Sequence, residues 1–422
     1  MRIPKNKKII YYIILLLCVK GFVITFAGSA EFINLAVDLL VFYAAYKAVK
    51  KVSSVPIKRF VGKGVMTTAV SFLVVGLVAD AFNLVPPLTA FWGARMVVRY
   101  AFLFYVMTKY LDAADADLAH RMLYKLFNLN IAACLYEFYV QYKGDLMGGT
   151  FKGNGELTIF AVICLFVFSL DYYQKRITLY AFVWRIIAIF VIAMWAEIKF
   201  LYFVTPLCLY AGYVLVKKFS IGHLVILSLA FVLLIPTLKF ALSFYYGEEY
   251  IEKTFDQQEI ENYNSHTAYN LSAAGISYNR NTCVEMAQAQ FLMDPMHGAI
   301  GHGLGAACAS GRFNTWIFDH FYATAYFFFT SSYVLIETGW IGYISFLLFY
   351  LFVLLRFWHY YRKSYDSILR FWTSLGVSLG GMTFLFIWYN DTPYATYCIV
   401  FMVWGFCALA IHNRLKELNL KL

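Results

Sequence analysis

Charged residues are scarce in this chain: Asp, Glu, Lys and Arg make up 14% of its 422 residues. An ordinary soluble domain carries about 25%. Hydrophobic residues reach 62%, aromatic residues 20%, and the mean hydropathy is +0.65. Aromatic rings collect where spanning helices meet lipid headgroups. This composition excludes a soluble globular protein and predicts an all-α, polytopic integral membrane protein.

Metal-binding motifs are also absent. The sequence has no Cys-x-x-Cys pair and no His/Cys cluster with the spacing of a zinc site. We therefore expect neither a metal nor a cofactor. Six of the eight cysteines fall in apolar segments, where thiols pack as small hydrophobes. The other two, Cys283 and Cys308, lie in a polar loop, and we expect them to form a disulfide in an oxidising compartment.

The first apolar segment, Met1–Phe26, lacks a small-residue cleavage site. We expect it to remain as a first span rather than to act as a signal peptide. A helix needs about 20 apolar residues to cross a hydrocarbon core ~30 Å thick, and we predict about twelve such spans on this basis. Their approximate cores are 9–26, 32–48, 61–80, 90–109, 125–142, 157–173, 178–196, 200–216, 221–245, 332–355, 369–389 and 393–411. Pro86-Pro87 and Glu197 could each mark a boundary or a kink within one helix.

Basic residues predict the orientation, because short loops rich in Lys and Arg stay in the cytoplasm. With both termini inside, all seven cytoplasmic segments contain basic residues: Met1–Lys8, Lys47–Arg59, Lys109–Lys125, Gln174–Arg176, Lys217-Lys218, Arg356–Arg370 and His412–Leu422. The opposite side has only Arg95, Lys143, Lys152, Lys199, Lys253, Arg280 and Arg312. The net charge of +11 is therefore attributed to this asymmetry, and no nucleic-acid partner is expected.

Residues 246–331 form the one long polar segment, which divides the chain into spans at 1–245, the loop, and spans at 332–422 with a cytoplasmic tail. Proteins that only move a solute tend to have short loops, because ordering each extra residue costs entropy. We predict a helix over 276–293 on the membrane face, with Arg280 near its beginning and Pro295 at its end. Five glycines from Gly298 to Gly311 then either let the backbone approach a ligand or fold it tightly on itself.

The loop and the next span carry a resemblance. Arg280, Pro295, Gly301-His-Gly-Leu-Gly305, Ser331-Ser332-Tyr333 and Glu337-Thr-Gly-Trp-Ile-Gly342 follow one another in that order. This order resembles the bacterial O-antigen polymerase and O-antigen ligase superfamily. Gly149-Thr-Phe-Lys-Gly-Asn154 is similar to a further segment of that family, and Lys199 stands where arginine is common. The resemblance covers about residues 145 to 345.

One departure from the family's pattern helps to distinguish a resemblance to its polymerases from a resemblance to its ligases. Ligases of this family carry a histidine shortly before the aromatic-glutamate-glycine run, whereas this sequence has Phe328, Phe329 and Ser331 there. The resemblance therefore favours a polymerase over a ligase. It implies an enzyme at the periplasmic face of the bacterial inner membrane that joins undecaprenyl-pyrophosphate-linked oligosaccharide units. The implied partners are that lipid-linked oligosaccharide, membrane lipids, a chain-length regulator and a flippase.

Such a reaction needs charge stabilisation for the leaving diphosphate, orientation of two substrates and a base. We expect Arg280 to be the main diphosphate clamp, because guanidinium binds phosphate oxygens bidentately, with Lys199 in support. Either residue could instead be a surface charge or a headgroup anchor. His320 and Glu337 complete the catalytic candidates. The substrate-binding candidates are Arg312, Lys152, Asn154, His297, His302, Gly303, Ser332, Tyr333, Arg95 and Arg99.

Two of these assignments have alternatives. Arg95 and Arg99 lie one helical turn apart within a span, where pairing with carboxylates such as Asp38 and Asp80 is favoured over a role facing pyrophosphate. Taken singly, His297, His302 and His320 are expected to be plain loop histidines, but one of the three could serve as the base, since imidazole titrates near physiological pH.

Two other functional classes are also open. Charged residues within spans fit a transporter or lipid-oligosaccharide flippase, although no internal repeat relates the two halves. A non-catalytic scaffold of a polysaccharide assembly complex is the other alternative.

Overall fold

The computed structural model describes residues 4, 7–27, 30–52, 55–217, 219–248, 278–308 and 315–420. The protein is all-α, with 81% helix and no strand in these ranges. Among the described residues, six helices are long and apolar enough to cross a membrane, and Leu179–Trp195 is a shorter apolar helix. The six are Lys63–Phe82, Asn154–Tyr173, Lys199–Val216, Thr330–Arg362, Ser367–Tyr389 and Cys398–Glu417. The chain is therefore a polytopic membrane protein, as the sequence predicts.

A long helix lies at each of the twelve predicted spans in the described chain. These helices are α1 (Lys8–Ala27), α2 (Ala30–Ala48), α4 (Lys63–Phe82), α5 (Pro87–Tyr110), α6 (Ala113–Tyr139), α7 (Asn154–Tyr173), α8 (Leu179–Trp195), α9 (Lys199–Val216), α10 (Ile221–Tyr246), α16 (Thr330–Arg362), α17 (Ser367–Tyr389) and α19 (Cys398–Glu417). Pro86-Pro87 and Glu197 mark boundaries between helices and not kinks within one helix. Helix α5 begins at Pro87, and α8 and α9 are separated by a turn at Glu197, whose φ is +51°.

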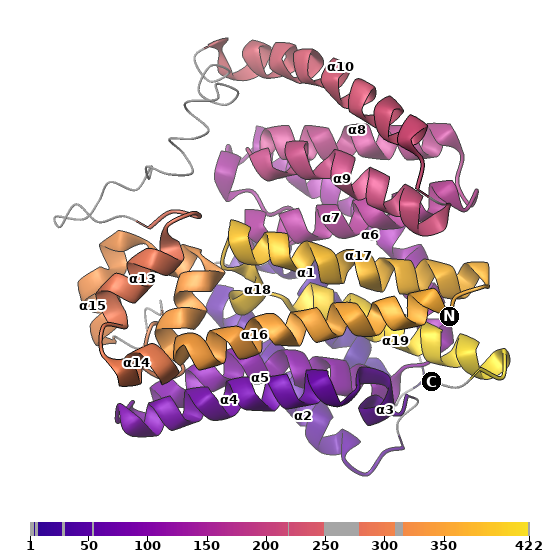
Figure 1. Ribbon diagram of the computed structural model, residues 1–422. Helices are drawn as coiled ribbons and strands as arrows, with labels where there is room; N and C mark the ends of the chain where they lie inside the picture. The colour runs from indigo at the N-terminus through magenta and orange to yellow at the C-terminus, as the bar shows by residue number, and fades with distance from the viewer. Residues whose placement is uncertain are drawn as a thin grey trace.

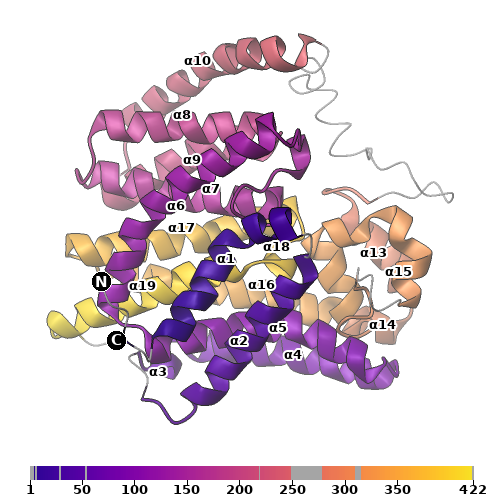
Figure 2. The same ribbon diagram turned by 180° about the vertical axis from the view of Figure 1, so that it is seen from behind.

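The centre of the bundle is formed by α7, α17 and α19, most of whose side chains are buried (Figure 1). Helix α16 packs against both α4 and α17, while α7 packs against α9. Small residues allow such close approach in membranes: a Cβ on Gly212 of α9 would lie 2.2 Å from the Ser169 hydroxyl of α7. On the opposite face, α1 and α2 lie side by side, with α2 against α5 (Figure 2).

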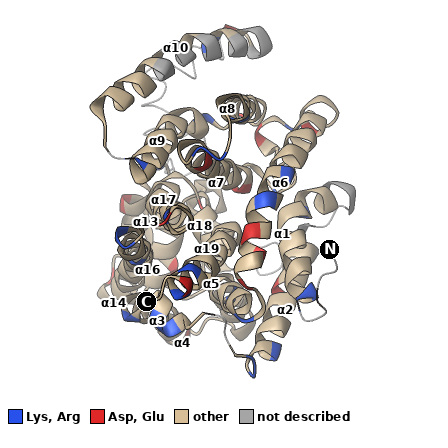
Figure 3. Ribbon diagram, turned by 90° about the vertical axis from the view of Figure 1, so that its right-hand side faces the viewer, with Lys and Arg blue, Asp and Glu red and all other residues tan. Residues whose placement is uncertain are grey.

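The described residues of the seven predicted cytoplasmic segments lie at one end of the bundle, the end that carries both termini (Figure 1 and Figure 3). Hydrogen bonds connect these segments or the helix turns next to them: Lys7 to Asp112 (2.7 Å), Lys109 to Lys51 O, Arg356 to Arg59 O, Gln174 to Ser367 O (3.1 Å), Tyr361 to Leu215 O (3.0 Å) and Arg414 to Asp366 (2.9 Å). The arrangement matches the alternation of the predicted topology. The compartment that each end faces stays a prediction.

Reporter fusions test that orientation. We expect alkaline phosphatase joined after Asn270 to be active, because the loop is predicted to lie outside the cytoplasmic membrane, and the same enzyme joined after Lys363 to be inactive. The basic residues at the opposite end are the physical reason. The reverse pattern of activities would overturn the orientation of the whole chain.

The described part of the loop forms a cap at the other end of the bundle (Figure 1). It contains α13 (Cys283–Phe291), α14 (Pro295–Ile300), α15 (Trp316–Phe321) and the single turns η2 (Tyr322–Thr324) and η3 (Tyr326–Phe328). The same end carries η1 (Gly144–Leu146) and α18 (Thr392–Ala395), whereas α3 (Ile57–Val61) lies near the termini.

Two details of the predicted loop are wrong. The expected helix over 276–293 covers only Cys283–Phe291, so that Arg280 lies in the turn before it. Pro295 does not end that helix but begins α14, and the Asp294 carboxylate accepts hydrogen bonds from the Met296 and His297 amides, both 3.0 Å. Proline suits a first helical position because its missing N–H has no partner there anyway.

The predicted disulfide is also wrong, because Cys283 and Cys308 are both buried free thiols. The Cys283 sulfur donates to the Arg280 carbonyl at 3.6 Å, at the start of α13. Cys308 follows the glycine-rich turn and faces the side chains of Tyr333 and Trp92. Burial raises the pKa of each thiol to about 11. Sequence position placed both cysteines in one loop, but the fold gives them different neighbours.

Candidate functional site

Arg280 and Lys199, the two predicted diphosphate ligands, come to the same turn of the structure at Tyr389. The Arg280 Nε donates to the Tyr389 carbonyl at 3.0 Å, and its guanidinium lies 4.8 Å from the centre of the Tyr389 ring. That ring stacks on Phe200, with 4.2 Å between centroids, and Phe200 directly follows Lys199, the first residue of α9. The ends of α9 and α17 and the start of the cap therefore meet here.

A carboxylate stands beside Lys199. Glu197 is half-buried in the turn before α9. Burial and the nearby Asp145 raise the pKa of the Glu197 carboxyl, whereas Lys199 acts in the opposite direction. The turn thus carries both signs of charge.

Lys152 lies just before α7, and Asn154 is the first residue of that helix. The Asn154 amide donates to Asp145 at 2.7 Å, and the Lys152 backbone N–H donates to Glu156 at 3.3 Å. A Cβ on Gly155 would come 3.0 Å from the Thr392 hydroxyl, so this segment packs closely on α18. Arg280 thus contacts the chain between Tyr389 and Thr392 directly, whereas Lys199 and Lys152 lie on segments whose Phe200 and Gly155 pack against it.

The short helix α18 is held from several sides. Its Tyr394 hydroxyl donates to the buried carboxylate of Glu337. Four further hydrogen bonds reach carbonyl groups of 390–395: Arg99 to Ala395 O, the Tyr100 hydroxyl to Tyr394 O (2.6 Å), the Tyr350 hydroxyl to Pro393 O (3.1 Å) and the Thr330 N–H to Asn390 O (3.1 Å). Because these donors come from α5 and α16, the turn is fixed to both of these helices.

Glu337, a predicted catalytic residue, connects two elements of the structure by accepting hydrogen bonds from both. Its side chain is 1% exposed. One carboxylate oxygen accepts from the Gly305 N–H at 2.9 Å, and the other accepts from the Tyr394 hydroxyl. The carboxylate therefore joins the glycine-rich turn of the loop to α18.

The glycine-rich turn folds tightly on itself and on the bundle, which is one of the two predicted alternatives. Gly303 has φ +104°, and a Cβ there would lie 2.4 Å from the Asp80 carboxylate. Gly305 has φ +81°, and its Cβ would lie 2.3 Å from the Thr89 carbonyl. Such positions require glycine for conformation and for space. Gly303 thus serves close packing in this structure.

Arg95 and Arg99 belong to a buried ionic cluster. Arg95 contacts the Asp38 carboxylate, and Arg99 lies 3.9 Å from it. Lys20 and Glu156 form a second buried pair. The predicted pairing with Asp38 is confirmed. Pairing with Asp80 is wrong, because Asp80 packs against the glycine-rich turn and makes no ion pair within the described chain.

The described loop histidines lie in two places. His297 and His302 stack with 4.2 Å between ring centroids, and His297 contacts Asn83 at the end of α4 (2.8 Å). Burial lowers the pKa of His302. His320 lies on the exposed side of α15, where it contacts the Trp316 carbonyl at 2.9 Å. These contacts tie the histidines to the cap. Arg312 lies outside the described residues.

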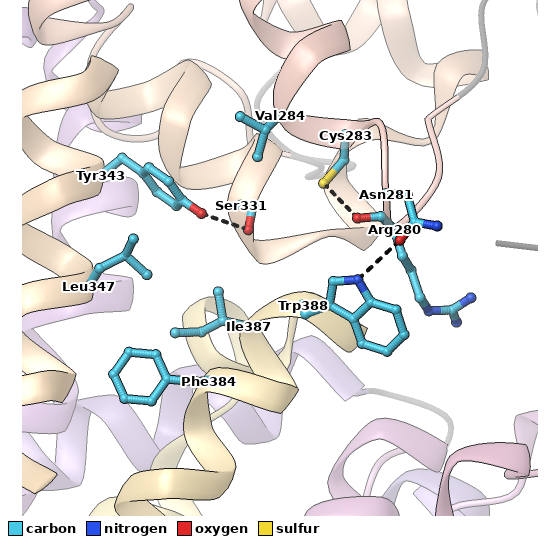
Figure 4. Close-up of a pocket in the computed structure, with 10 residues that line it drawn as sticks. All are labelled: Arg280, Asn281, Cys283, Val284, Ser331, Tyr343, Leu347, Phe384, Ile387 and Trp388. Atoms are coloured by element: carbon cyan, nitrogen blue, oxygen red, sulfur yellow. Dashed lines mark hydrogen bonds between the residues drawn. The ribbon is translucent and has the colours of Figure 1, made fainter. Parts of the chain in front are cut away.

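A cavity of about 390 Å³ opens between α13, α16 and α17, with Arg280 at its rim (Figure 4). Trp388 stands between the Arg280 guanidinium and the interior, where the Tyr343 hydroxyl donates to Ser331 at 3.0 Å. Its other walls are mainly apolar. The predicted ligands Ser332 and Tyr333 lie elsewhere: Ser332 donates to the Tyr326 carbonyl at 2.6 Å, and Tyr333 packs on Tyr394.

A second cavity, of about 540 Å³, lies further along α16 and α17 and is lined almost entirely by apolar side chains. Both cavities border the same two helices. The second one includes residues of α7 and α9, such as Phe166 and Leu207, and Gly381 of α17.

Asp391 is a residue that the sequence reading missed. It precedes α18 and lies two residues after Tyr389, in the segment Asn390-Asp-Thr-Pro393 between two apolar runs. Aspartate before proline is a common signal for a turn that begins a helix, and it could have marked this place. Its position among the basic residues depends on packing between distant segments, which no local pattern reveals.

No family model matches the chain, and no curated protein matches it either.

Proposed function

We propose that the protein is a membrane glycosyltransferase of the polysaccharide polymerase type. It joins undecaprenyl-pyrophosphate-linked oligosaccharide units at the outer face of the bacterial inner membrane. The observation that carries the proposal is the convergence of Arg280 and Lys199 on the Tyr389 turn, with Lys152 on the adjoining segment. A group of cations at a membrane face suits a leaving diphosphate, whose developing charge is the main electrostatic demand of the reaction.

The lipid part of such a substrate has a matching environment. The two cavities along α16 and α17 are largely apolar, and the one nearer the cap has Arg280 at its rim. A polyprenyl chain in contact with these helices would place its diphosphate near the basic residues. The charged diphosphate would then contact the basic residues, and the polyprenyl chain would contact the apolar cavities.

The choice of polymerase over ligase rests on the residues before Tyr333, where Phe328, Phe329 and Ser331 stand in place of a histidine. A flippase is the second candidate function. It is favoured by the buried Lys20–Glu156 and Asp38–Arg95 pairs, because charges within spans are costly and commonly mark a transport path.

The experiment uses purified protein in vesicles that contain undecaprenyl-pyrophosphate-linked repeat units. We expect a ladder of longer saccharides and a stoichiometric release of undecaprenyl pyrophosphate. Transfer of finished polymer to a lipid acceptor, without any lengthening, would indicate a ligase. Movement of the lipid-linked unit across the bilayer with no new glycosidic bond would indicate a flippase. In a strain that lacks the chain, the polymerase function predicts single capped units on the cell surface.

A further inference from the structure

We infer that Asp391 is the general base that accepts the proton of the attacking sugar hydroxyl. This inference rests on the proposed glycosyl transfer and deepens it by naming a residue for the step that the basic residues cannot perform.

The position of Asp391 favours this role. Asp391 lies two residues beyond the carbonyl that holds Arg280, and the charged groups that act on it are Lys152, just before α7, and Glu156, in the first turn of α7. Its neighbours from Tyr389 to Ala395 carry no charge. Arg99 and Glu337 contact the other end of α18, through Ala395 and Tyr394. Asp391 is therefore the carboxylate closest along the chain to the carbonyl that holds Arg280, whereas Glu197 lies beside Lys199 in the turn before α9.

The carboxylate of Asp391 also has free acceptor positions. Asp391 as a whole residue is half-buried, and its carboxylate lies where burial is the main influence on its pKa. Within the described chain, the hydrogen bond that acts on its carboxylate comes from its own backbone N–H. The carboxylate of Glu337, in contrast, is buried and accepts from Gly305 and Tyr394. A base must reach a substrate proton, and Asp391 has the free acceptor capacity to do so.

The turn that carries Asp391 is also held rigidly. A catalytic group works best when its supporting residues fix it near the productive geometry. The hydrogen bonds from Arg99, Tyr100, Tyr350 and Thr330 hold the chain from 390 to 395 against the buried core. These residues are positioning residues for Asp391. The conformation of the turn thus does not depend on a bound substrate.

The carboxyl also has suitable acidity. Burial raises the pKa of Asp391 to about 7, with a further rise from Glu156 and opposing contributions from its own backbone hydrogen bond and from Lys152. A base is most effective when its pKa lies near the working pH, because it is then both ionised and able to hold a proton. An ordinary surface aspartate, with a pKa of about 3.9, is a much weaker base.

The step balances as follows. The hydroxyl oxygen of one unit forms a bond to the anomeric carbon of the other, and its proton passes to the Asp391 carboxylate. The bond from that carbon to the diphosphate oxygen breaks, and the electron pair leaves with the polyprenyl diphosphate, next to Arg280 and Lys199. The Asp391 carboxyl then releases its proton to water.

The test measures glycosyl transfer by purified wild-type protein, Asp391→Asn and Asp391→Glu. We expect Asp391→Asn to lower kcat by about 10²- to 10⁴-fold, the usual contribution of a general base. Asp391→Glu should recover part of the rate. Binding of undecaprenyl pyrophosphate should stay unchanged in both, because neither variant removes a cation. Glu285→Gln, at an exposed carboxylate of α13, is the matched control and should keep the wild-type rate.

The pH profile provides a second measurement that does not require the variants to fold. Protonation of Asp391 removes the base, so the wild-type kcat should fall about tenfold per pH unit as the pH drops below about 7. A wild-type kcat that is flat between about pH 5.5 and 8 overturns the inference, as does an Asp391→Asn rate within about threefold of wild type. Wild-type protein with no transfer at all overturns the proposed function, and this inference with it.

Discussion

Replacing Arg280 with alanine should abolish polymer formation while leaving the protein in the membrane at normal amounts. The Arg280 guanidinium already lies at the Tyr389 turn, and we assign it to the leaving diphosphate. Hydrogen bonds to charged groups contribute about 1.5–3 kcal/mol each, so the loss of a bidentate contact should lower the transfer rate by on the order of 10²-fold or more. The measurement is the rate of saccharide lengthening by purified protein, together with polymer length in cells.

Conservative changes separate geometry from charge. Arg280→Lys keeps the charge but loses the planar fork, so the polymer should become shorter or disappear. Lys199→Arg should retain activity, because the resembled family commonly has arginine there, whereas Lys199→Ala should lose most of it. Arg121→Ala is a suitable control, because Arg121 is an exposed arginine near the start of α6, at the end where the termini lie. Polymer of normal length from Arg280→Ala would remove Arg280 from the site. The same result for Lys199→Ala would reduce Lys199 to a headgroup anchor.

The sequence predicts the helices well because each one depends on local composition. An apolar run of about 20 residues has few alternatives to forming a helix in a bilayer, because every backbone polar group there needs an internal hydrogen-bond partner. The positions of α4, α5, α8 and α9 follow from this rule together with Pro87 and Glu197 as boundaries. The gathering of the basic segments at one end also agrees with the predicted alternation of loops.

The candidate site was predictable only in part. Arg280 and Lys199 were singled out from the sequence, but their convergence depends on the stack of Tyr389 on Phe200, a contact between α17 and α9. Asp391 was missed because its importance comes from Lys152 and Glu156, which lie more than two hundred residues earlier in the chain. Short motifs report the residue types at a site but not the partners that packing gives them.

The glycine-rich turn shows a second limit of sequence reading. Glycines before a span fit both a ligand-binding turn and a tightly packed one, and the choice between them depends on what lies opposite. In the structure the Asp80 carboxylate lies against Gly303 and the Thr89 carbonyl lies against Gly305. Glu337 completes this packing by accepting the Gly305 N–H. Gly303 and Glu337, which the resemblance places at a substrate, therefore contact other parts of the protein in this structure.

Replacing Glu337 with alanine should destabilise the protein and inactivate it to a similar degree. The change leaves the Gly305 N–H and the Tyr394 hydroxyl without their acceptor in a buried place, and each unsatisfied donor costs about 1–3 kcal/mol. The turn that carries Asp391 also loses one of its hydrogen bonds to α16, while those from Tyr350 and Thr330 remain. We expect the midpoint of thermal unfolding in detergent to fall by several degrees and the transfer rate to fall with it.

Two further variants distinguish this positioning role from direct catalysis. Glu337→Gln keeps one acceptor oxygen, so it should be intermediate in both unfolding temperature and rate. Tyr394→Phe removes only the hydroxyl partner, and combining it with Glu337→Ala should cost less than the sum of the two single changes, because both break the same hydrogen bond. A catalytic carboxylate behaves differently: Glu337→Gln would then keep the wild-type unfolding temperature and lose the rate entirely. That outcome would return Glu337 to the catalytic residues, and the support of α18 from α16 would then rest on Tyr350 and Thr330.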